Sequence, residues 1–295
     1  MIANPNVKIN LGLNILRKRE DGFHDLETLF VPYFGITDTL EIIAGDDYSR
    51  TSAAIFGKYA PEMIAQGISE DGSLMITIAR AEGVDWDPLK DLTAKAYYVL
   101  AEDFKMPPVK IFLEKTSPVG AGLGGGSADA AFALKMLNEL CELGLSDQQL
   151  AGYASRLGSD CAFFIYNRPM IGEGRGEILT DIAWELPFSC HPDSLCHPER
   201  SEGSFVLQVL TPEGISVSTK DAYAGIRPHL PEVSLKDALS KPVEEWADVL
   251  VNDFEETVFA KYPELAAIKR SLYDSGAVYA SMSGSGSALF ALYRK

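Results

Sequence analysis

Apolar and polar residues alternate in several stretches of the chain, and the first of these begins close to the N-terminus. Val7, Ile9 and Leu11 occupy every second position, and after a charged turn at 18–22 apolar positions resume at 26–33. A period of two residues places alternate side chains on opposite faces of a strand, so the first fifty residues are predicted to be extended. The same reasoning predicts further strands at 39–43, 74–78 and 109–115.

Helical spacing of apolar residues predicts three helices in the same half of the chain. They are expected at 92–104, over about four turns after a glycine-rich loop at 117–127, and at 146–156. Pro107 lies just beyond the first helix, Gly144 ends the second and Ser146 caps the third, which are the usual signals for helix ends.

The second half of the chain mixes strands and helices without strict alternation. A strand is predicted at 205–210, helical structure near 220–226, 243–259 and 265–275, and a final hairpin with strands at 276–282 and 288–293 around a loop at 283–287. A doubly wound parallel sheet would need regular alternation of strands and helices, so the predicted fold class is α+β. We expect two domains, at 1–166 and 167–295.

One polar stretch, 189–204, interrupts two strand-like segments and is predicted to be a surface insertion. Cys190 and Cys196 lie there beside His191 and His197, and such a set could also bind zinc, although the spacing fits no common zinc site. With four cysteines in all, the chain lacks a disulfide framework, and a reducing cytoplasm is the expected setting.

Charge narrows the classes of partner. The chain has 295 residues, with 42 acidic and 26 basic side chains and a formal net charge of −16. Such a chain offers little positive surface to nucleic acid or to an anionic membrane. No run of about 18 apolar residues predicts a membrane span. We therefore expect neither nucleic acid nor a membrane as partner.

The glycine-rich loop is the clearest candidate for chemistry. Five of the seven positions from 120 to 126 are glycine, which lets backbone N–H groups approach a ligand closely. The loop leads into the N-terminus of a helix, where unpaired N–H groups and the helix dipole favour an anion. Ser127 could cap that helix or offer its hydroxyl to a phosphate or a metal. The loop is therefore predicted to bind phosphate.

From the residues alone, one interpretation of this loop is excluded and two stay open. A Walker A loop is excluded because no lysine follows the glycines. The spacing Gly120-x-Gly122-x-x-Gly125 matches a dinucleotide fingerprint, so an NAD-dependent oxidoreductase is one alternative. A second helix follows the loop helix, however, where a dinucleotide-binding unit would have a strand. A nucleotide-binding protein without catalysis is another alternative.

Four segments carry a resemblance to a known family. They are NPNVKINLGLNI with DGFHDLETLF, PVGAGLGGGSADAA, RLGSDCAFF and SMSGSGSALFALY. In this order, and over nearly the whole chain, they resemble the GHMP kinase superfamily. The resemblance implies an α+β fold of two domains, an ATP-binding N-terminal domain and a substrate-side C-terminal one, with the active site in the cleft between them. It also implies transfer of the γ-phosphate of ATP to a small molecule, with Mg²⁺ bridging the nucleotide phosphates.

The segments K-I-N-L and G-F-H narrow the resemblance within this superfamily. They are similar to those of the members that phosphorylate the 2-hydroxyl of 4-diphosphocytidyl-2-C-methyl-D-erythritol, in the non-mevalonate (MEP) route to isoprenoid precursors. Kinases of the mevalonate or homoserine type are the alternative. Either implies small-molecule partners, and the chain would act as a monomer or a homodimer in the cytoplasm.

Two catalytic residues follow from the resemblance. Asp160 corresponds to the aspartate that takes the proton of the substrate hydroxyl, and Lys8 corresponds to the lysine paired with it. From the residues alone, Asp160 could instead cap a helix, and Lys8 could be solvated on an edge strand.

The resemblance also implies binding residues. For ATP they are Lys115, Asp91, Pro118, Gly120, Gly122, Leu123, Gly124, Gly125, Gly126 and Ser127; for the substrate they are Asn10, Phe23, His24, Tyr223, Gly284 and Gly286. His24 would read the cytosine edge and Tyr223 would cover a face of the base. Phe23 stands where the family usually has tyrosine, and Asp91 where it usually has asparagine. The resemblance assigns no magnesium ligand.

Overall fold

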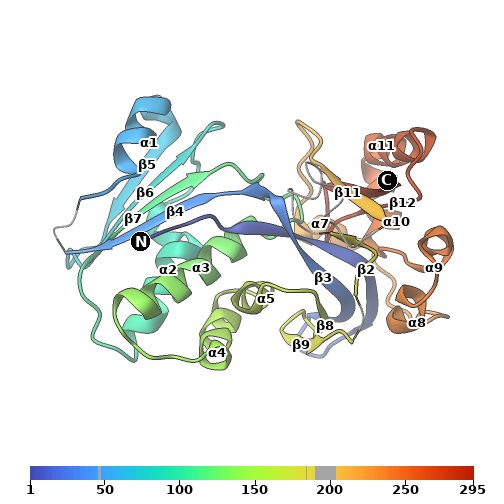
Figure 1. The fold of residues 1–295 in the computed structure, drawn as a ribbon, viewed down its shortest axis with the longest axis horizontal. Coiled ribbons are helices and arrows are strands. Elements are labelled where there is room, and N and C mark those ends of the chain that lie inside the picture. Colours follow the sequence, from blue (N-terminus) through green and yellow to red (C-terminus); the bar gives the residue numbers. More distant parts are fainter. Residues whose placement is uncertain (46–47, 184, 190–203) are drawn as a thin grey trace. The chain divides into compact units, whose positions relative to one another are not determined.

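The computed structural model describes residues 1–295 except 46–47, 184 and 190–203 (Figure 1). The chain forms two compact units, each assembled from separate stretches: 1–7, 36–119 and 124–167 in the first, and 8–35, 120–123 and 168–295 in the second. The predicted insertion at 189–204 and its candidate zinc ligands, Cys190 and Cys196, therefore fall almost entirely outside the described residues.

A five-stranded sheet with the order β1-β4-β7-β6-β5 forms the centre of the first unit. β4 runs antiparallel to β7, whereas β6 runs parallel to it. The strands are β1 (Ile2–Ala3), β4 (Thr39–Ala44), β5 (Ile64–Ile68), β6 (Leu74–Arg80) and β7 (Val109–Lys115). The strands predicted at 39–43, 74–78 and 109–115 are confirmed.

Helices lie on both faces of this sheet (Figure 1). α2 (Leu92–Ala101) and α3 (Gly125–Leu140) pack together on one face, and α1 (Ser52–Lys58) lies on the other, where Ile55 joins Ile43 and Phe112 in an apolar cluster. The remaining helices are α4 (Asp147–Leu157), α5 (Cys161–Tyr166) and the 3₁₀ turns η1 (Pro61–Met63) and η2 (Pro88–Lys90). Ser146 caps α4 in a capping box with Gln149, which confirms the predicted cap.

The order of elements after the glycine-rich loop argues against a dinucleotide-binding unit. Such a unit needs a parallel strand directly after the loop helix. Here α3 is followed by α4 and α5, and no strand of the described part of the first unit comes after them. In this order of elements, the spacing of Gly120, Gly122 and Gly125 does not indicate a dinucleotide-binding unit.

The second unit contains two four-stranded sheets, although the ends of β2 and β3 extend into the first unit. One has the order β2 (Asn6–Lys18), β3 (His24–Thr37), β8 (Met170–Gly174) and β9 (Ile178–Asp181); the other has the order β10 (Phe188–Ser189), β11 (Phe205–Leu210), β13 (Leu289–Arg294) and β12 (Tyr279–Met282). β12 and β13 pair antiparallel, as the predicted hairpin requires.

Helices of the second unit are short, and one prediction for them needs a correction. They are α7 (Thr219–Ala224), α8 (Leu235–Leu239), η4 (Val243–Glu245), α9 (Trp246–Val249), α10 (Phe254–Lys261) and α11 (Pro263–Asp274). The helical stretch predicted at 243–259 is interrupted between α9 and α10. There the carbonyl of Val251 and the N–H of Asp253 bond to the backbone of Leu13 in β2, at 2.8 and 2.9 Å. Local spacing cannot reveal this long-range pairing.

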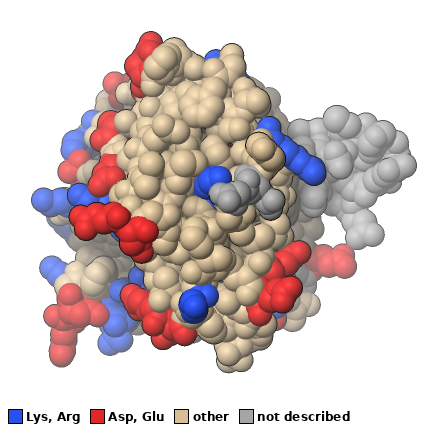
Figure 2. All heavy atoms as spheres, turned by 90° about the vertical axis from the view of Figure 1, so that its left-hand side faces the viewer, with Lys and Arg blue, Asp and Glu red and all other residues tan. Residues whose placement is uncertain are grey.

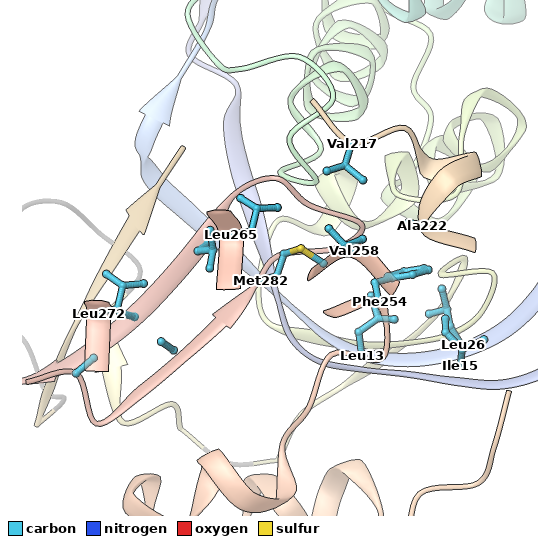
Figure 3. Packing of buried hydrophobic residues seen from close by; sticks show 14 residues of the cluster. Leu13, Ile15, Leu26, Val217, Ala222, Phe254, Val258, Leu265, Leu272 and Met282 are labelled. Carbon is cyan, nitrogen blue, oxygen red and sulfur yellow. The ribbon is translucent and has the colours of Figure 1, made fainter. Parts of the chain in front are cut away.

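An apolar cluster holds these helices against the strands of the second unit (Figure 3). Leu13 comes from β2, Phe254 from α10, Leu265 from α11 and Met282 from β12, and all four are almost fully buried. The cluster therefore fixes β2 relative to α10 and β12, the elements that carry much of the candidate site.

The compact units differ from the predicted division at 166/167. The chain enters the second unit for the last time at residue 168, but 8–35 and 120–123 also belong to that unit. β3 pairs with β8 along Leu26–Phe30, and this pairing draws the first hairpin into the second unit. Residues 8–35 therefore belong to a different compact unit from most of the N-terminal half.

Charged side chains of both signs occur together on the surface drawn in Figure 2. Asp and Glu form groups there, with Lys and Arg among them, around a broad area of other residues. Fields of neighbouring opposite charges offset one another at short range. An anionic ligand therefore depends on the charges of its own site rather than on the net charge of −16.

Candidate active site

β2 carries polar side chains into the interior of the second unit, among them Lys8 and Asn10. Residues 6–15 of this strand are all buried, so polar side chains on it are buried together with the apolar row. Lys8 and Asn10 stand two positions apart and point to the same side of the strand. Lys8 is only 3% exposed, so the alternative of a solvated lysine on an edge strand is wrong.

Two neutral oxygen atoms orient the ammonium group of Lys8. Its Nζ donates to the backbone carbonyl of Gly122 at 2.7 Å and to Oδ1 of Asn10. The backbone N–H of Lys8 donates to the carbonyl of Leu123 at 2.9 Å. These bonds fix the position of the ammonium group relative to Gly122 and Asn10.

Asn10 and Ser283 complete this arrangement, which also includes Thr28 and which we call the Lys8 cluster (Lys8, Asn10, Thr28, Gly122 and Ser283). The N–H of Asn10 donates to Oγ of Ser283 at 3.3 Å, and that hydroxyl donates to the carbonyl of Gly122 at 3.1 Å. Nδ2 of Asn10 donates to Oγ1 of Thr28 at 3.2 Å. The bonds leave Asn10 one orientation, with Oδ1 towards Lys8.

The glycine-rich loop and the loop of the C-terminal hairpin pack backbone against backbone. Gly122 has a φ of 77°, and a Cβ there would lie 2.2 Å from the carbonyl oxygen of Ser283. A Cβ on Gly284 would lie 2.9 Å from the carbonyl oxygen of Gly122. The N–H of Ala288 donates to the carbonyl of Ala121 at 3.0 Å. Position 122 requires glycine both for its conformation and for this close approach.

A second buried lysine lies in the first unit, in a set of residues that we call the Lys115 cluster (Lys115, Asp38, Ser117 and Asp129). Nζ of Lys115 donates to Oδ2 of Asp38 at 2.7 Å, to Oδ2 of Asp129 at 2.7 Å and to Oγ of Ser117 at 3.1 Å. An ammonium group has three donors, and all three are used here. A direct bond from Lys115 to ATP would therefore have to replace one of these contacts.

Asp38 ties the start of the glycine-rich loop to the sheet. Its carboxylate accepts the backbone N–H groups of Thr116 and Ser117 at 2.6 and 2.7 Å, and the hydroxyl of Ser117 at 2.6 Å. Gly125 packs on the same serine, because a Cβ there would lie 2.3 Å from Oγ of Ser117. The two ends of the loop in the first unit are thus held by the Lys115 cluster.

The two carboxylates of this cluster have opposite pKa shifts. Burial would raise the pKa of Asp38, but Lys115 and the bonds from Ser117 hold the pKa of Asp38 below its ordinary value. Burial raises the pKa of Asp129 well above its ordinary value, because the attraction of Lys115 does not offset burial and the repulsion of Asp38. Oδ1 of Asp129 has no hydrogen-bond partner among the described residues. The ammonium of Lys115 thus pairs with two carboxylates, and the ionised form of Asp38 is stabilised more than that of Asp129.

α3 begins differently from the prediction. Its N-cap is Gly124, which has a φ of 73°, and Ser127 is the third residue of the helix rather than its cap. Burial raises the pKa of the Cys161 thiol to about 12, although the nearby Ser127 hydroxyl lowers that pKa in part. Gly126 and Ser127 therefore lie in the first turn, where backbone N–H groups favour an anion.

Asp160 and Asp91 both stand at helix starts in the first unit. Asp160 is the half-buried N-cap residue of α5, but its side chain makes no capping bond to the described residues of that helix. Asp91 is a true cap, since Oδ1 accepts the N–H of Thr93 at 2.8 Å, and Oδ2 accepts Nε1 of Trp86 at 3.0 Å. The structure therefore gives Asp91 a structural role, whereas capping does not account for Asp160.

Aromatic residues of the predicted substrate side lie together in the second unit. The rings of His24 and Tyr223 stack with centroids 4.8 Å apart and an interplanar angle of 21°. At this distance no pyrimidine fits between them, so Tyr223 could cover the base opposite His24 only if the two rings separated. Phe23 is 54% exposed, and the guanidinium of Arg175 lies 5.1 Å from its ring centroid.

The residues predicted for the site divide between the units. Asp160, Lys115, Asp91, Pro118, Gly124, Gly125, Gly126 and Ser127 belong to the first; Lys8, Asn10, Gly120, Gly122, Leu123, Phe23, His24, Tyr223, Gly284 and Gly286 belong to the second. Each unit thus contains part of the glycine-rich loop and a buried lysine that bonds to residues close to the loop. The roles of these residues in binding and catalysis stay predictions.

Sequence patterns missed the residues that support this arrangement. Asp38 follows a strand-like stretch, and nothing local indicates that it reaches Ser117, 79 positions away. Asp129 follows the glycines closely, and acidic side chains near a helix start are usually solvated, but Asp129 is 1% exposed. Ser283 and Thr28 lie within two of the segments that carry the family resemblance, but neither residue was predicted to belong to the site.

The part of the chain that the structure describes contains neither a metal-binding cluster nor a membrane-spanning helix. No group of three or more His, Cys, Asp or Glu side chains there could hold a metal ion. No helix in the described ranges combines the length and apolar character needed to cross a membrane. The candidate zinc ligands at 190 and 196 lie outside these ranges.

Similarity to known proteins extends over the chain. Residues 91–168 match the GHMP kinases N terminal domain, and residues 234–295 match the GHMP kinases C terminal domain. The 4-diphosphocytidyl-2-C-methyl-D-erythritol kinase of Bacteroides fragilis is 43% identical over 293 residues, which cover 99% of this chain and 92% of that relative. A protein of the same name from Cytophaga hutchinsonii is 38% identical, with the same coverage.

Solved structures are similar over the same length. A crystal structure of 4-(cytidine 5'-diphospho)-2C-methyl-D-erythritol kinase has a TM-score of 0.71 and 27% identity, with 99% of this chain and 90% of that chain covered. Homoserine kinase from Cytophaga hutchinsonii has a TM-score of 0.62 and 17% identity, with 99% and 86% covered, a similarity of fold alone.

Proposed function

Because the chain belongs to the GHMP kinase family, we propose that it transfers the γ-phosphate of ATP to the 2-hydroxyl of 4-diphosphocytidyl-2-C-methyl-D-erythritol. Relatives that carry the name of that kinase match this chain over nearly its full length. The products would be ADP and the phosphorylated intermediate of the MEP pathway. This proposal replaces the alternative that the glycine-rich loop binds a dinucleotide in an NAD-dependent oxidoreductase.

The exposed start of α3 is the observation that carries the nucleotide part of this proposal. Gly126 lies in the first turn, and the nearest described atom to a Cβ there would be Cδ1 of Leu92 at 3.9 Å. Packing within the protein therefore does not require glycine at 126. Close approach of a phosphate to the backbone N–H groups of a helix N-terminus does favour it.

Asp160 and Lys8 are the residues that we propose for the chemical step. Phosphoryl transfer depends mainly on positioning and on charge stabilisation. Asp160 would take the proton of the substrate hydroxyl as general base. Lys8, oriented by Gly122 and Asn10, would offset negative charge that develops on the transferred group.

We propose that His24 and Phe23 recognise the cytosine base. Burial and the charge of Lys18 lower the pKa of His24 from its ordinary value, which favours a neutral imidazole near pH 7. A neutral imidazole has one donor and one acceptor, which suits an edge that also presents both. The exposed ring of Phe23 would stack on the base.

Magnesium would accompany the nucleotide. Because the described residues contain no cluster of three acidic, histidine or cysteine side chains, the ion would be held mainly by phosphate oxygens and water, as is common for Mg²⁺. It would neutralise charge on the phosphates. Oligomeric state, cytoplasmic localisation and an active site in a cleft between domains stay predictions.

A substrate panel tests the proposed function. The purified chain with Mg-ATP should release ADP when 4-diphosphocytidyl-2-C-methyl-D-erythritol is added, but not with mevalonate, homoserine or galactose. Asp160→Asn should lower kcat by about 10²–10⁴-fold while ATP still binds, because only the general base is removed.

Asp147→Asn is the matched control, because Asp147 is an exposed first-turn acid of α4. This variant should keep wild-type turnover. ADP release with mevalonate or homoserine but not with the cytidyl substrate would overturn the substrate and leave the kinase class. Full activity of Asp160→Asn would overturn the proposed base.

A further inference from the structure

The segment Asn252–Glu255, which leads into α10 and includes its first two residues, uses its three polar side chains on the backbone of other elements. We call it the clamp segment. Oδ2 of Asp253 accepts the N–H of Ile15 in β2 at 2.6 Å. Oε1 of Glu255 accepts the N–H of Met282 in β12 at 2.8 Å, and Lys269 holds its other oxygen at 2.6 Å. The clamp segment thus connects β2 to β12.

Asn252 makes the bonds closest to the Lys8 cluster. Its side chain is 3% exposed, and Nδ2 donates to the carbonyls of Met282 at 2.7 Å and Gly284 at 2.9 Å. Its Oδ1 accepts the N–H of Phe254 at 3.0 Å. Both carbonyls flank Ser283, so the amide of Asn252 donates hydrogen bonds to the backbone on each side of that residue.

The position of Ser283 has narrow limits. Its hydroxyl accepts the N–H of Asn10 and donates to the carbonyl of Gly122, the acceptor of Lys8. A methyl group on Gly122 would already lie 2.2 Å from the Ser283 carbonyl oxygen, so the two loops cannot move closer. If they moved apart, the bonds that orient Lys8 would be lost. A shift of the hairpin loop therefore changes the orientation of Lys8.

We propose that Asn252 is a positioning residue for phosphoryl transfer, which holds the hairpin loop at the distance where Ser283 orders Gly122, Asn10 and Lys8. It does not touch the reacting groups itself. That this positioning matters for catalysis rests on the proposed function.

The surroundings of Asn252 separate positioning from folding. Leu13, Phe254 and Met282 belong to one apolar cluster of the second unit, and all three are labelled in Figure 3. This cluster, together with the bonds of Asp253 and Glu255, keeps β2, α10 and β12 packed without the amide of Asn252. Loss of that amide should therefore loosen the loop more than it lowers global stability.

The test compares Asn252→Ala and Asn252→Asp with the wild type. Both remove the two donors, and the aspartate keeps the shape. Displacement of a catalytic group by about 1 Å can cost about 100-fold in rate, so we expect kcat per folded molecule to fall by about 10–100-fold. Amide hydrogen exchange at Ser283, Gly286 and Ala288 should rise at least about tenfold, since their bonds open locally.

Asn138→Ala is the matched control, because Nδ2 and Oδ1 of Asn138 also bridge a backbone carbonyl and N–H, both of Leu145 in the first unit. It should leave kcat and exchange at the hairpin loop unchanged. Combining Asn252→Ala with Ser283→Ala should cost little more than the larger single effect, since both act through one contact.

The outcomes separate the positioning role from the proposed function. Unchanged exchange at the hairpin loop, or unchanged kcat per folded molecule in both Asn252 variants, would overturn the positioning role. Fully additive losses in the double variant would overturn the route through Ser283. A wild type without kinase activity would overturn the proposed function, whereas the exchange measurement would still report whether Asn252 holds the loop.

Discussion

Two buried lysines, one in each unit, donate hydrogen bonds to different sets of residues. Nζ of Lys115 donates to two carboxylates and a hydroxyl, so its charge is balanced inside the first unit. Nζ of Lys8 donates to a backbone carbonyl and an amide oxygen in the second unit. Acidic partners stabilise a buried cation, and the two neutral oxygen atoms beside Lys8 fix the direction of its ammonium group.

This difference assigns the lysines different tasks, although both were predicted for the site. The Lys115 cluster holds the ends of the glycine-rich loop in the first unit, through Asp38, Ser117 and Gly125. We infer that Lys115 affects ATP through the loop. Lys8 is oriented by Gly122 of the glycine-rich loop and by Asn10 of β2, and it is the lysine that we assign to chemistry.

The largest effect on stability should come from Lys115→Met. Removal of the ammonium leaves two carboxylates buried without their cation, which costs about 3–5 kcal/mol in the free energy of unfolding. Urea denaturation at neutral pH measures this loss. Lys90→Met is the control on an exposed lysine of the same unit and should change stability by less than about 0.5 kcal/mol. Stability of Lys115→Met within 1 kcal/mol (about fivefold in the folding equilibrium) of wild type would contradict a structural Lys115.

Asp38→Asn and Asp129→Asn should have effects of opposite sign. Asp38 accepts four hydrogen bonds, and the NH2 group of an amide there would face other donors, either the two backbone N–H groups or the Lys115 ammonium, so we expect a loss of about 2–3 kcal/mol at pH 7. Asp129→Asn removes the second buried carboxylate and should increase stability by about 1 kcal/mol.

The pH dependence of these variants follows from the directions of the pKa shifts. The lowered pKa of Asp38 contributes stability above the unfolded pKa of about 3.9, and this contribution is lost as the pH falls through the folded pKa. The raised pKa of Asp129 costs stability as the pH rises from about 3.9 towards the folded pKa. The advantage of Asp129→Asn should thus shrink on acidification to pH 4. An advantage that grew in acid would show that the two carboxylates had been assigned the wrong roles.

Local patterns predicted the elements of the site better than its contacts. The strand at 109–115, the cap at Ser146 and the C-terminal hairpin depend on near neighbours in the sequence and were confirmed. The interruption at 250–253 depends on Leu13, and the bonds of Asp38 depend on residues nearly eighty positions away. Periodicity contains no information on such pairings.

The same limit applies to the roles of single residues. The motifs around Lys8 and Lys115 indicated two important lysines but could not show that Lys115 pairs with Asp38 and Asp129. Ser127 satisfied the local rule for a cap, yet Gly124 became the cap because its left-handed conformation begins the helix three residues earlier. Asn252 lies in no motif with an evident purpose, and only its bonds to Met282 and Gly284 single it out.

Single-turnover phosphoryl transfer by Lys8→Met, at saturating ATP and cytidyl substrate, tests the division between the two lysines most directly. We expect the rate to fall by about 10²–10³-fold, because charge stabilisation of the transferred group is lost. The urea midpoint should stay far closer to wild type than that of Lys115→Met. A rate within threefold (a barrier change below about 0.7 kcal/mol) of wild type, or a loss of stability equal to that of Lys115→Met, would contradict the account.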